Sequence, residues 1–371
     1  MRIDSLELTG FRNYVNQKAE FCPSVNVITG DNAQGKTNLL EAVYFLTAGK
    51  SFRSRFDREI IGLDRDAARL RAAVESDGRE QKLEIILKKG QKKQIFVNNN
   101  RLKTSSELVG RFTCVLFCPD DLYLIKEGAS VRRRLIDNCV SQLRPRYGQL
   151  ISEYGRVYAH KSQILKFYRE KPSLLDTFDV YSQRMCLLSA HIIHYRSKFI
   201  QALGEKAEEI HREFSGGEEL GLRYRTVSTV TDCSDSVEAL YEQLWQHQLS
   251  HKRAELESGS CLTGIHKDDI EIYVNSLEAR KFASQGQCRT AALSIKLAER
   301  ELHYSARGEY PVLLLDDVLS ELDPSRQKFV LNHIENGQIF ITCCGDEEKL
   351  GLRAGRIIRV RNGVLENCTS I

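Results

Sequence analysis

The 371-residue sequence has no apolar run of about 18 residues, the length that a membrane-spanning helix requires. It begins Met1-Arg2-Ile3-Asp4, which predicts an opening strand and not a signal peptide. The net charge is only +4, so charge alone does not indicate a nucleic-acid-binding protein. These absences argue against a membrane protein and favour a cytoplasmic globular chain with room for two domains.

Paired metal-binding cysteine motifs are also missing. The sequence holds 11 cysteines, but no CxxC pair answers another. Cys114, Cys343 and Cys344 have apolar neighbours, which predicts small buried thiols in a reducing compartment. We therefore expect neither a zinc site nor a disulfide framework.

The chain does contain a complete GxxxxGKT motif. It follows Val25–Thr29, which reads as a short buried strand, and precedes Asn38–Leu46, which has helical apolar spacing. Backbone amides of such a loop turn toward a polyphosphate, the lysine reaches the β and γ phosphates, and the threonine holds Mg²⁺. The residues predicted to surround ATP are Gly30, Asp31, Asn32, Ala33, Gln34, Gly35, Lys36 and Thr37.

A second phosphate-handling sequence follows almost three hundred residues later. The apolar run Pro311–Leu315 ends in Asp316 and Asp317, as in a parallel strand buried on both faces. Taken alone, the two acids could simply end the strand in a turn. With the upstream loop, Asp316 is predicted to hold Mg²⁺ beside Thr37. Asp317 is predicted to orient the attacking water, so Asp317 and Lys36 are the candidate catalytic residues.

Two segments compete for the signature that an ATP-binding-cassette head presents to the γ-phosphate of its partner. Ser215–Glu218 is followed by the alternating Leu220–Arg225, which predicts a turn before a strand. Ser284–Gln287 opens a strong Ala/Leu helix, so it is the better candidate. The sequence therefore predicts that Ser284, Gly286 and Gln287 contact ATP held by a second copy, in an ATP-dependent homodimer.

Two further elements follow in the expected order. Val318–Asp323 has the spacing of a cassette D-loop, which places Asp323 near the nucleotide. Thr342 ends one more buried strand, at the position where relatives often carry a switch histidine. Together these elements predict an α/β fold, an ABC-type P-loop ATPase head.

The chain resembles the RecF family, bacterial recombination-mediator ATPases related to SMC proteins. The segments that carry the resemblance, besides the motifs above, are Gly10–Tyr14, Gly49–Arg53, Phe117–Leu122, Arg132–Asp137, Gly264–Asp269, Phe282–Gln287 and Leu314–Asp323. The chain departs from the family pattern at Asp120, Ile265 and Lys267. The resemblance implies that Arg12 and Asn13 also contact ATP.

The resemblance implies an ATP-dependent protein of DNA repair, replication and the SOS response. Such a protein dimerises on double-stranded and gapped DNA, at junctions of single and double strands, and works with RecO and RecR to load the recombinase. Asp317 is one methylene shorter than the glutamate of transporter ATPases, which favours a weak, DNA-stimulated ATPase acting as a switch. The alternative is another soluble ABC-type subunit, from a transporter or a toxin system.

Helical periodicity organises the middle of the chain. Apolar residues recur at helical spacing over 144–168 and again over 175–213, joined at Lys171–Ser173. We expect these two helices to form an antiparallel arm far shorter than an SMC coiled coil, and the chain to return through short strands near 221–230 and a helix over 236–256. The predicted head comprises 1–120 and 260–371, and the inserted helical arm domain comprises 121–259.

Positive charge gathers in one part of the arm. Residues 130–172 hold ten Lys and Arg against three Asp and Glu. We predict DNA contacts from Arg132, Arg133, Arg134 and Lys161, made to the backbone because no recognition-helix motif is present. Lys88–Lys93 reads as a lysine-rich hairpin tip, which is more often solvated than bound. For His266 we expect a structural or interface role.

Overall fold

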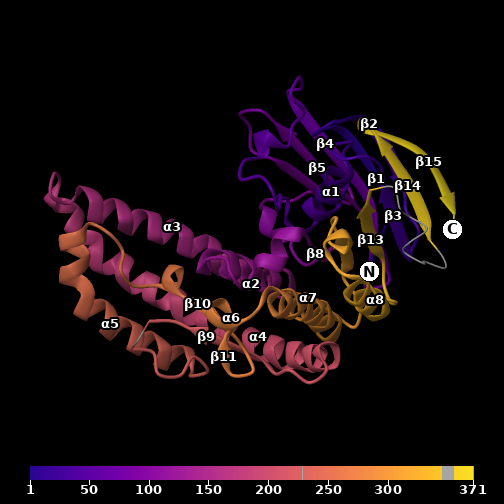
Figure 1. The fold of residues 1–371 in the computed structure, drawn as a ribbon. Helices are drawn as coiled ribbons and strands as arrows, with labels where there is room; N and C mark the ends of the chain where they lie inside the picture. The colour runs from indigo at the N-terminus through magenta and orange to yellow at the C-terminus, as the bar shows by residue number, and fades with distance from the viewer. Residues whose placement is uncertain (228, 345–354, 371) are drawn as a thin grey trace. The chain divides into compact units, whose positions relative to one another are not determined.

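The computed structural model describes residues 1–227, 229–344 and 355–370 (Figure 1). They divide into two compact units, one formed by Met1–Leu122 with Lys296–Ile371 and the other by Tyr123–Ile295. Residues 260–295, which the sequence prediction assigned to the head, therefore belong to the second unit. Positions 345–354 and 371 of the predicted head lie outside the described residues.

The first unit is built mainly from strands. Its elements are β1 (Arg2–Phe11), β2 (Tyr14–Glu20), β3 (Val25–Thr29), α1 (Lys36–Ala48), η1 (Asp57–Glu59), β4 (Ala67–Ser76), β5 (Arg79–Lys88), β6 (Gln94–Val97), β7 (Asn100–Arg101), η2 (Ser105–Glu107), β8 (Cys114–Phe117), η3 (Pro119–Tyr123), β12 (Val312–Leu315), η6 (Leu319–Glu321), α8 (Pro324–His333), β13 (Ile339–Cys343), β14 (Arg356–Arg361) and β15 (Val364–Ser370).

These strands form two six-stranded sheets. One is antiparallel, in the order β2-β1-β4-β5-β6-β7, and its β5–β6 pairing confirms the predicted lysine-rich hairpin. The other has the order β15-β14-β3-β13-β12-β8, with parallel pairing from β14 to β8. Apolar runs such as Val312–Leu315 are buried throughout, as expected of parallel strands covered on both faces.

Helix α1 belongs to the core that both sheets share. Its side chains Leu39, Val43 and Phe45 are fully buried in a cluster that includes residues of β1, β4 and β12. A helix buried nearly all round is positioned by packing and not by its own propensity. The N-terminus of α1 is therefore held at a fixed place relative to β3.

The second unit is mainly helical. Its elements are α2 (Ala129–Leu143), α3 (Pro145–Phe167), η4 (Pro172–Thr177), α4 (Phe178–Ser215), β9 (Leu220–Arg225), α5 (Val237–Ser258), η5 (Ile265–Lys267), β10 (Asp269–Val274), β11 (Leu277–Glu278), α6 (Ala279–Phe282) and the first turns of α7 (Gln285–Arg307). Strand β10 pairs antiparallel with both β9 and β11. This pairing ties residues 269–278 to the arm, which is why the unit extends well beyond 260.

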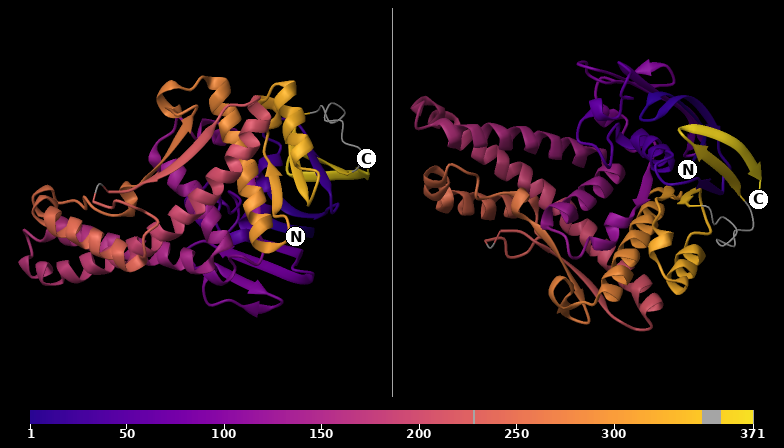
Figure 2. Two further views of the ribbon diagram at one scale, coloured as in Figure 1. Left: turned by 90° about the horizontal axis from the view of Figure 1, so that it is seen from below. Right: turned by 45° about the horizontal axis from the view of Figure 1, so that its top comes forward.

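The predicted arm is present. Helices α3 and α4 are joined through η4 and pack together with α5, and both views in Figure 2 show the three helices alongside one another. Ile164, Leu165 and Phe178 form a small apolar cluster where α3 turns toward α4. Within the part of the chain that the structure describes, no helix is long and apolar enough to cross a membrane.

Candidate nucleotide-binding site

The sheet topology brings three sequence-distant segments to one edge of the parallel sheet. Strands β3, β13 and β12 are neighbours and run in the same direction. The loop from Gly30 after β3, Thr342 near the end of β13 and Asp316 after β12 must therefore meet at the carboxyl edge, where α/β sheets bind ligands.

The loop between β3 and α1 needs glycine at two close approaches. Gly30 has φ of 149°, and a Cβ there would lie 2.3 Å from the Val360 carbonyl oxygen. Gly35 has φ of 123°, and a Cβ would lie 2.7 Å from Asn13 Nδ2. Both φ values are ones that glycine adopts readily and other residues rarely do. The carbonyl of Gln34 accepts the Gly363 N–H at 2.9 Å, so β14 and β15 also hold the loop.

Lys36 is buried and its ammonium folds back over the loop. Its Nζ donates to the carbonyl oxygens of Gly30 at 2.7 Å and Asp31 at 3.1 Å. Cys344 Sγ lies 3.2 Å from the same nitrogen and 3.0 Å from Asn32 Oδ1. The prediction that Cys344 is a buried thiol is wrong, because its side chain is exposed beside this lysine. Cys114 is buried as predicted.

The side-chain oxygens of Thr37 and Asp316 lie next to each other. The Thr37 hydroxyl donates to Asp316 Oδ1 at 2.9 Å. Burial raises the pKa of Asp316, the charge of Asp317 adds to this effect, and hydrogen bonds from Thr37 and Thr342 oppose it. A carboxylate and a hydroxyl with room for phosphate oxygens are the ligand set that Mg²⁺ takes in nucleotide sites. Among the described residues, no group of three or more His, Cys, Asp or Glu could hold a metal ion alone.

Asp317 has an unusual backbone conformation. Its φ is 52°, in the left-handed region that few residues other than glycine adopt. Thr342 supports this turn by accepting the Asp317 N–H at 2.7 Å, and its hydroxyl lies 3.3 Å from Asp317 Oδ1. Thr342 thus contacts both acids, since it also lies 3.1 Å from Asp316 Oδ1.

Arg12 and Asn13 lie next to the loop with their side chains already engaged. Arg12 forms a bidentate ion pair with the fully buried Glu41, at 2.8 and 2.7 Å. Asn13 Nδ2 donates to the Gln34 carbonyl at 2.8 Å, and Asn13 Oδ1 accepts from Asn38. Glu41 was not among the predicted site residues, although an acid inside the apolar stretch of α1 indicates a buried partner.

Asp323 serves a structural purpose in this structure. Its carboxylate accepts the N–H groups of Ser325 and Arg326 at 3.1 Å each and so caps α8. The Arg326 guanidinium, which pairs with the carboxylate, holds the pKa of Asp323 below its usual value. The remaining predicted loop residues, Asp31, Asn32 and Ala33, are exposed along the loop.

The predicted signature lies in the second unit, at the N-terminus of α7. Ser284 Oγ accepts the Gln287 N–H at 3.2 Å, while Gln287 Oε1 accepts the Ser284 N–H at 3.0 Å. This reciprocal pair is a capping box. Gly286 lies in the first turn of the helix, and the Ser284 side chain is exposed. The competing segment Ser215–Glu218 instead ends α4, where Gly216 has φ of 75°.

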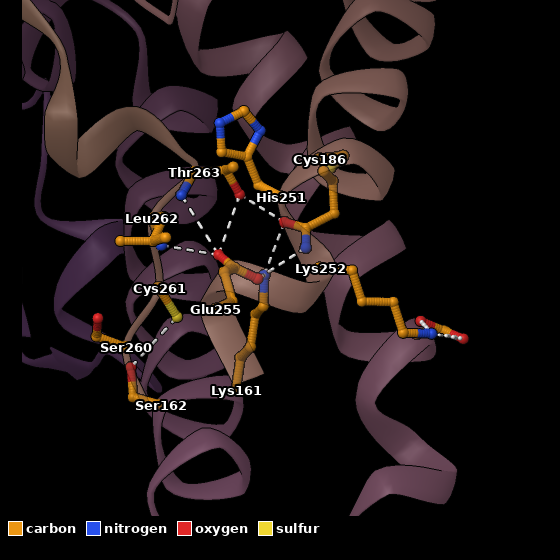
Figure 3. A network of polar contacts seen from close by, with 12 residues as sticks. Lys161, Ser162, Cys186, His251, Lys252, Glu255, Ser260, Cys261, Leu262 and Thr263 are labelled. Atoms are coloured by element: carbon orange, nitrogen blue, oxygen red, sulfur yellow. Dashed lines mark hydrogen bonds and ion pairs between the residues drawn. The ribbon is translucent and has the colours of Figure 1, made fainter. Parts of the chain in front are cut away.

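Two of the predicted DNA contacts are wrong because their side chains are buried. Lys161 is fully buried and pairs with Glu255 Oε2 at 2.7 Å, inside the polar network of Figure 3. Arg132 forms a bidentate pair with Asp269 at 2.8 and 2.9 Å. Both cations are buried and paired, Lys161 with the fully buried Glu255 and Arg132 with the half-buried Asp269, so neither is available to a phosphate.

The other two predicted cations differ from these. Arg133 is half-buried and donates to the Asp268 carbonyl at 2.5 Å, whereas Arg134 is exposed. His266 Nδ1 lies 2.8 Å from the Tyr154 hydroxyl, and its ring packs 4.6 Å from the Tyr158 ring. Burial lowers the pKa of His266, which fits a neutral ring packed in the arm.

Comparison with known proteins agrees with this architecture. The RecF/RecN/SMC N terminal domain model matches residues 2–363. The DNA replication and repair protein RecF of Clostridium perfringens is 37% identical over 368 residues, covering 99% of this chain and all of the relative. The protein of the same name from Acetivibrio thermocellus is 40% identical over 348 residues, covering 94% of each.

Solved structures give the same result. The recombination mediator protein RecF-ATPrS in the RecFOR pathway superposes with a TM-score of 0.92 at 34% identity, covering 98% of this chain and 97% of that one. An Smc head bound to the C-winged helix domain of ScpA, at TM-score 0.57 and 16% identity, shares the fold alone. The chain belongs to the RecF family of DNA replication and repair proteins, within the wider family of RecF, RecN and SMC heads.

Proposed function

We propose that this chain binds ATP with Mg²⁺ at the carboxyl edge of its parallel sheet and uses it to close a homodimer on DNA. The observation that carries the proposal is the hydrogen bond between Thr37, at the start of α1 beside Lys36, and Asp316, which follows β12 and is 279 residues further along the chain. Relatives solved as RecF-ATP and RecF-ATPrS support it.

Each residue of the site has a separate role. When bound, ATP would supply the phosphoanhydride bond, and Mg²⁺ would supply positive charge that neutralises the phosphate oxygens. Lys36 exchanges the carbonyl oxygens of Gly30 and Asp31 for β- and γ-phosphate oxygens, a stronger charge-assisted contact. Thr37 and Asp316 hold the metal ion. Asp317, half-buried and turned by its left-handed backbone, orients the attacking water.

The same geometry supports slow hydrolysis. Asp317 is shorter than a glutamate, and Thr342 engages both its backbone and its carboxylate. A carboxylate that is short and tethered cannot advance toward the water as far as a longer side chain would. We infer a weak, DNA-stimulated ATPase whose nucleotide state acts as a switch.

Dimerisation is supported by the surface around the signature. Ser284 is exposed, and two large apolar side chains nearby are exposed as well, Phe282 at 66% and Leu277 at 57%. Aromatic side chains such as Phe282 are enriched at the centre of protein interfaces. The turn at Ser284 is therefore proposed to meet the γ-phosphate held by a second copy.

DNA binding is assigned to exposed cations at the base of the arm. Arg134 on α2, Arg144 at the junction of α2 and α3, and Arg146 on α3 are all exposed. In this proposal they replace Arg132 and Lys161, whose side chains are buried. Such contacts go to phosphates and read gapped or junction DNA by shape. Relatives in the RecFOR pathway support a role with RecO and RecR in loading the recombinase.

Light scattering of the purified chain with gapped duplex DNA, with and without ATP, tests this function. We expect the mass of a DNA-bound dimer only when ATP and Mg²⁺ are present. The variant with Arg134, Arg144 and Arg146 changed to Glu should still dimerise with ATP. The slope of its log DNA affinity against log salt concentration should become shallower by about 0.9 for each phosphate contact removed. ATP-independent binding, or an unchanged slope, would contradict the assignment.

A further inference from the structure

The signature turn is held by a residue from a distant segment of the second unit. Glu218 lies just after the end of α4, and its Oε1 accepts from Gln287 Nε2 at 2.6 Å. Gln287 Oε1 accepts the Ser284 N–H. A carboxylate only accepts hydrogen bonds, so it fixes which end of the glutamine amide faces it. The contact therefore leaves the amide oxygen for Ser284.

The end of α4 is shaped to present this carboxylate. Gly216 and Gly217 have φ of 75° and 118°, conformations suited to glycine, and the Gly217 N–H bonds to the Arg212 carbonyl at 3.1 Å. The backbone N–H of Glu218 then donates to Ser215 Oγ at 3.0 Å. The segment that resembles a signature by its letters is thus a rigid helix end pointing Glu218 at the signature.

A buried histidine lies beside the same carboxylate without a hydrogen bond to it. His211 Nε2 lies 3.6 Å from Glu218 Oε2, and His211 Nδ1 lies 3.3 Å from Ser294 Oγ on α7. Because the Ser294 hydroxyl donates to the Thr290 carbonyl at 2.9 Å, the proton between His211 and Ser294 belongs to His211. α4 therefore contacts α7 through the His211–Ser294 hydrogen bond, while Nε2 of the neutral ring has no proton to donate to Glu218.

We propose that Glu218 is the positioning residue of the signature turn. It orients Gln287, Gln287 holds the Ser284 backbone, and Ser284 keeps its hydroxyl proton for a phosphate oxygen because its own oxygen accepts the Gln287 N–H. The inference rests on the proposed role of Ser284 toward ATP on a second copy. Glu218 acts through Gln287 and does not itself touch nucleotide.

Three variants test the proposal. Glu218→Ala removes the acceptor, Glu218→Gln keeps an amide oxygen that can accept from Gln287, and Glu219→Ala is the matched control at the exposed neighbouring carboxylate. We expect Glu218→Ala to bind ATP as the parent does but to lose about 10- to 100-fold in kcat, because small misplacements of this kind have such effects. Glu218→Gln should recover most of that loss.

Hydrogen exchange at Ser284–Gln287 measures the positioning directly, whether or not the chain hydrolyses ATP. Glu218→Ala should speed exchange there, and the other two variants should not. Parental exchange and turnover in Glu218→Ala would overturn the proposal, as would Glu218→Gln failing as badly as Glu218→Ala. A parent chain that exchanges as expected but has no ATP-dependent dimer or turnover would instead contradict the proposed function.

Discussion

Helices α1 and α7 both open at a glycine-containing, polar turn, yet their first backbone groups are treated differently. At α1 the N-cap is Gly35, which offers no side chain to the N–H groups of the first turn. At α7, Ser284 and Gln287 cap the helix reciprocally, and Glu218 holds the glutamine. The first terminus is left to a ligand, whereas the second is organised before any ligand arrives.

The difference fits the roles that we propose for the two termini. A helix N-terminus without a side-chain cap, with a lysine folded beside it, is suited to surround a polyphosphate. A terminus that meets phosphate only after a second copy arrives must keep its shape in the free chain, because disorder there would cost free energy on association. We therefore place primary ATP affinity at α1 and dimer closure at α7.

The largest expected effect lies at the α1 terminus. Lys36→Met removes the ammonium that lies over the loop, so ATP affinity should fall by about 100-fold, the equivalent of a lost charge-assisted contact. Isothermal titration calorimetry measures the change, and an unaltered melting temperature shows that the fold is intact. Ser284→Ala is the matched change at α7 and should leave the affinity unaltered. Equal losses in both variants would remove the distinction between the two termini.

A smaller effect is expected from the exposed thiol. Alkylation of Cys344 by iodoacetamide places an adduct beside Lys36 and Asn32, so ATP affinity should fall by about tenfold, or 1.4 kcal/mol. ATP should protect Cys344 from the reagent, as mass spectrometry of the modified peptide can measure. The Cys344→Ser chain should keep its affinity on treatment. If it loses affinity as the parent does, another cysteine is responsible.

The smallest effect concerns stability and pH. Burial raises the pKa of Asp316, so its charged form costs stability in the nucleotide-free chain at neutral pH. The stability contributed by this group is fully present below its unfolded pKa and is lost as pH rises through the raised value. Asp316→Asn should therefore raise the melting temperature at neutral pH, less so in acid, and abolish further stabilisation by Mg²⁺ and ATP. A lower melting temperature would contradict this account.

Much of the architecture could be predicted because local patterns were strong. The GxxxxGKT motif between strand and helix, the run Val312–Leu315 and the helices at 144–168 and 175–213 all appear in the structure. Ser284 was preferred over Ser215 as a helix opener because a strand follows the latter, and β9 and α7 confirm that reasoning.

The predictions that failed depended on contacts between residues far apart in the chain. Lys161 and Arg132 belong to a basic stretch, and nothing local shows that Glu255 and Asp269 neutralise them in the fold. Glu218 looked like part of a turn, and its contact with Gln287 spans 69 residues. Charge counted along a sequence cannot separate exposed cations from buried pairs, because burial is decided by partners far away in the chain.

The central claim is that α1 and Asp317 act on the chain's own nucleotide while Ser284 acts on that of a second copy. Mixing the Ser284→Arg and Asp317→Asn chains tests it most directly. Each chain alone should bind ATP but hydrolyse none. The mixture should regain up to about a quarter of parental turnover, because random pairing makes about half the dimers mixed and each holds one intact site of two. If Ser284→Arg instead abolishes ATP binding by the isolated monomer and mixing restores nothing, the chain handles its nucleotide alone and the claim is contradicted.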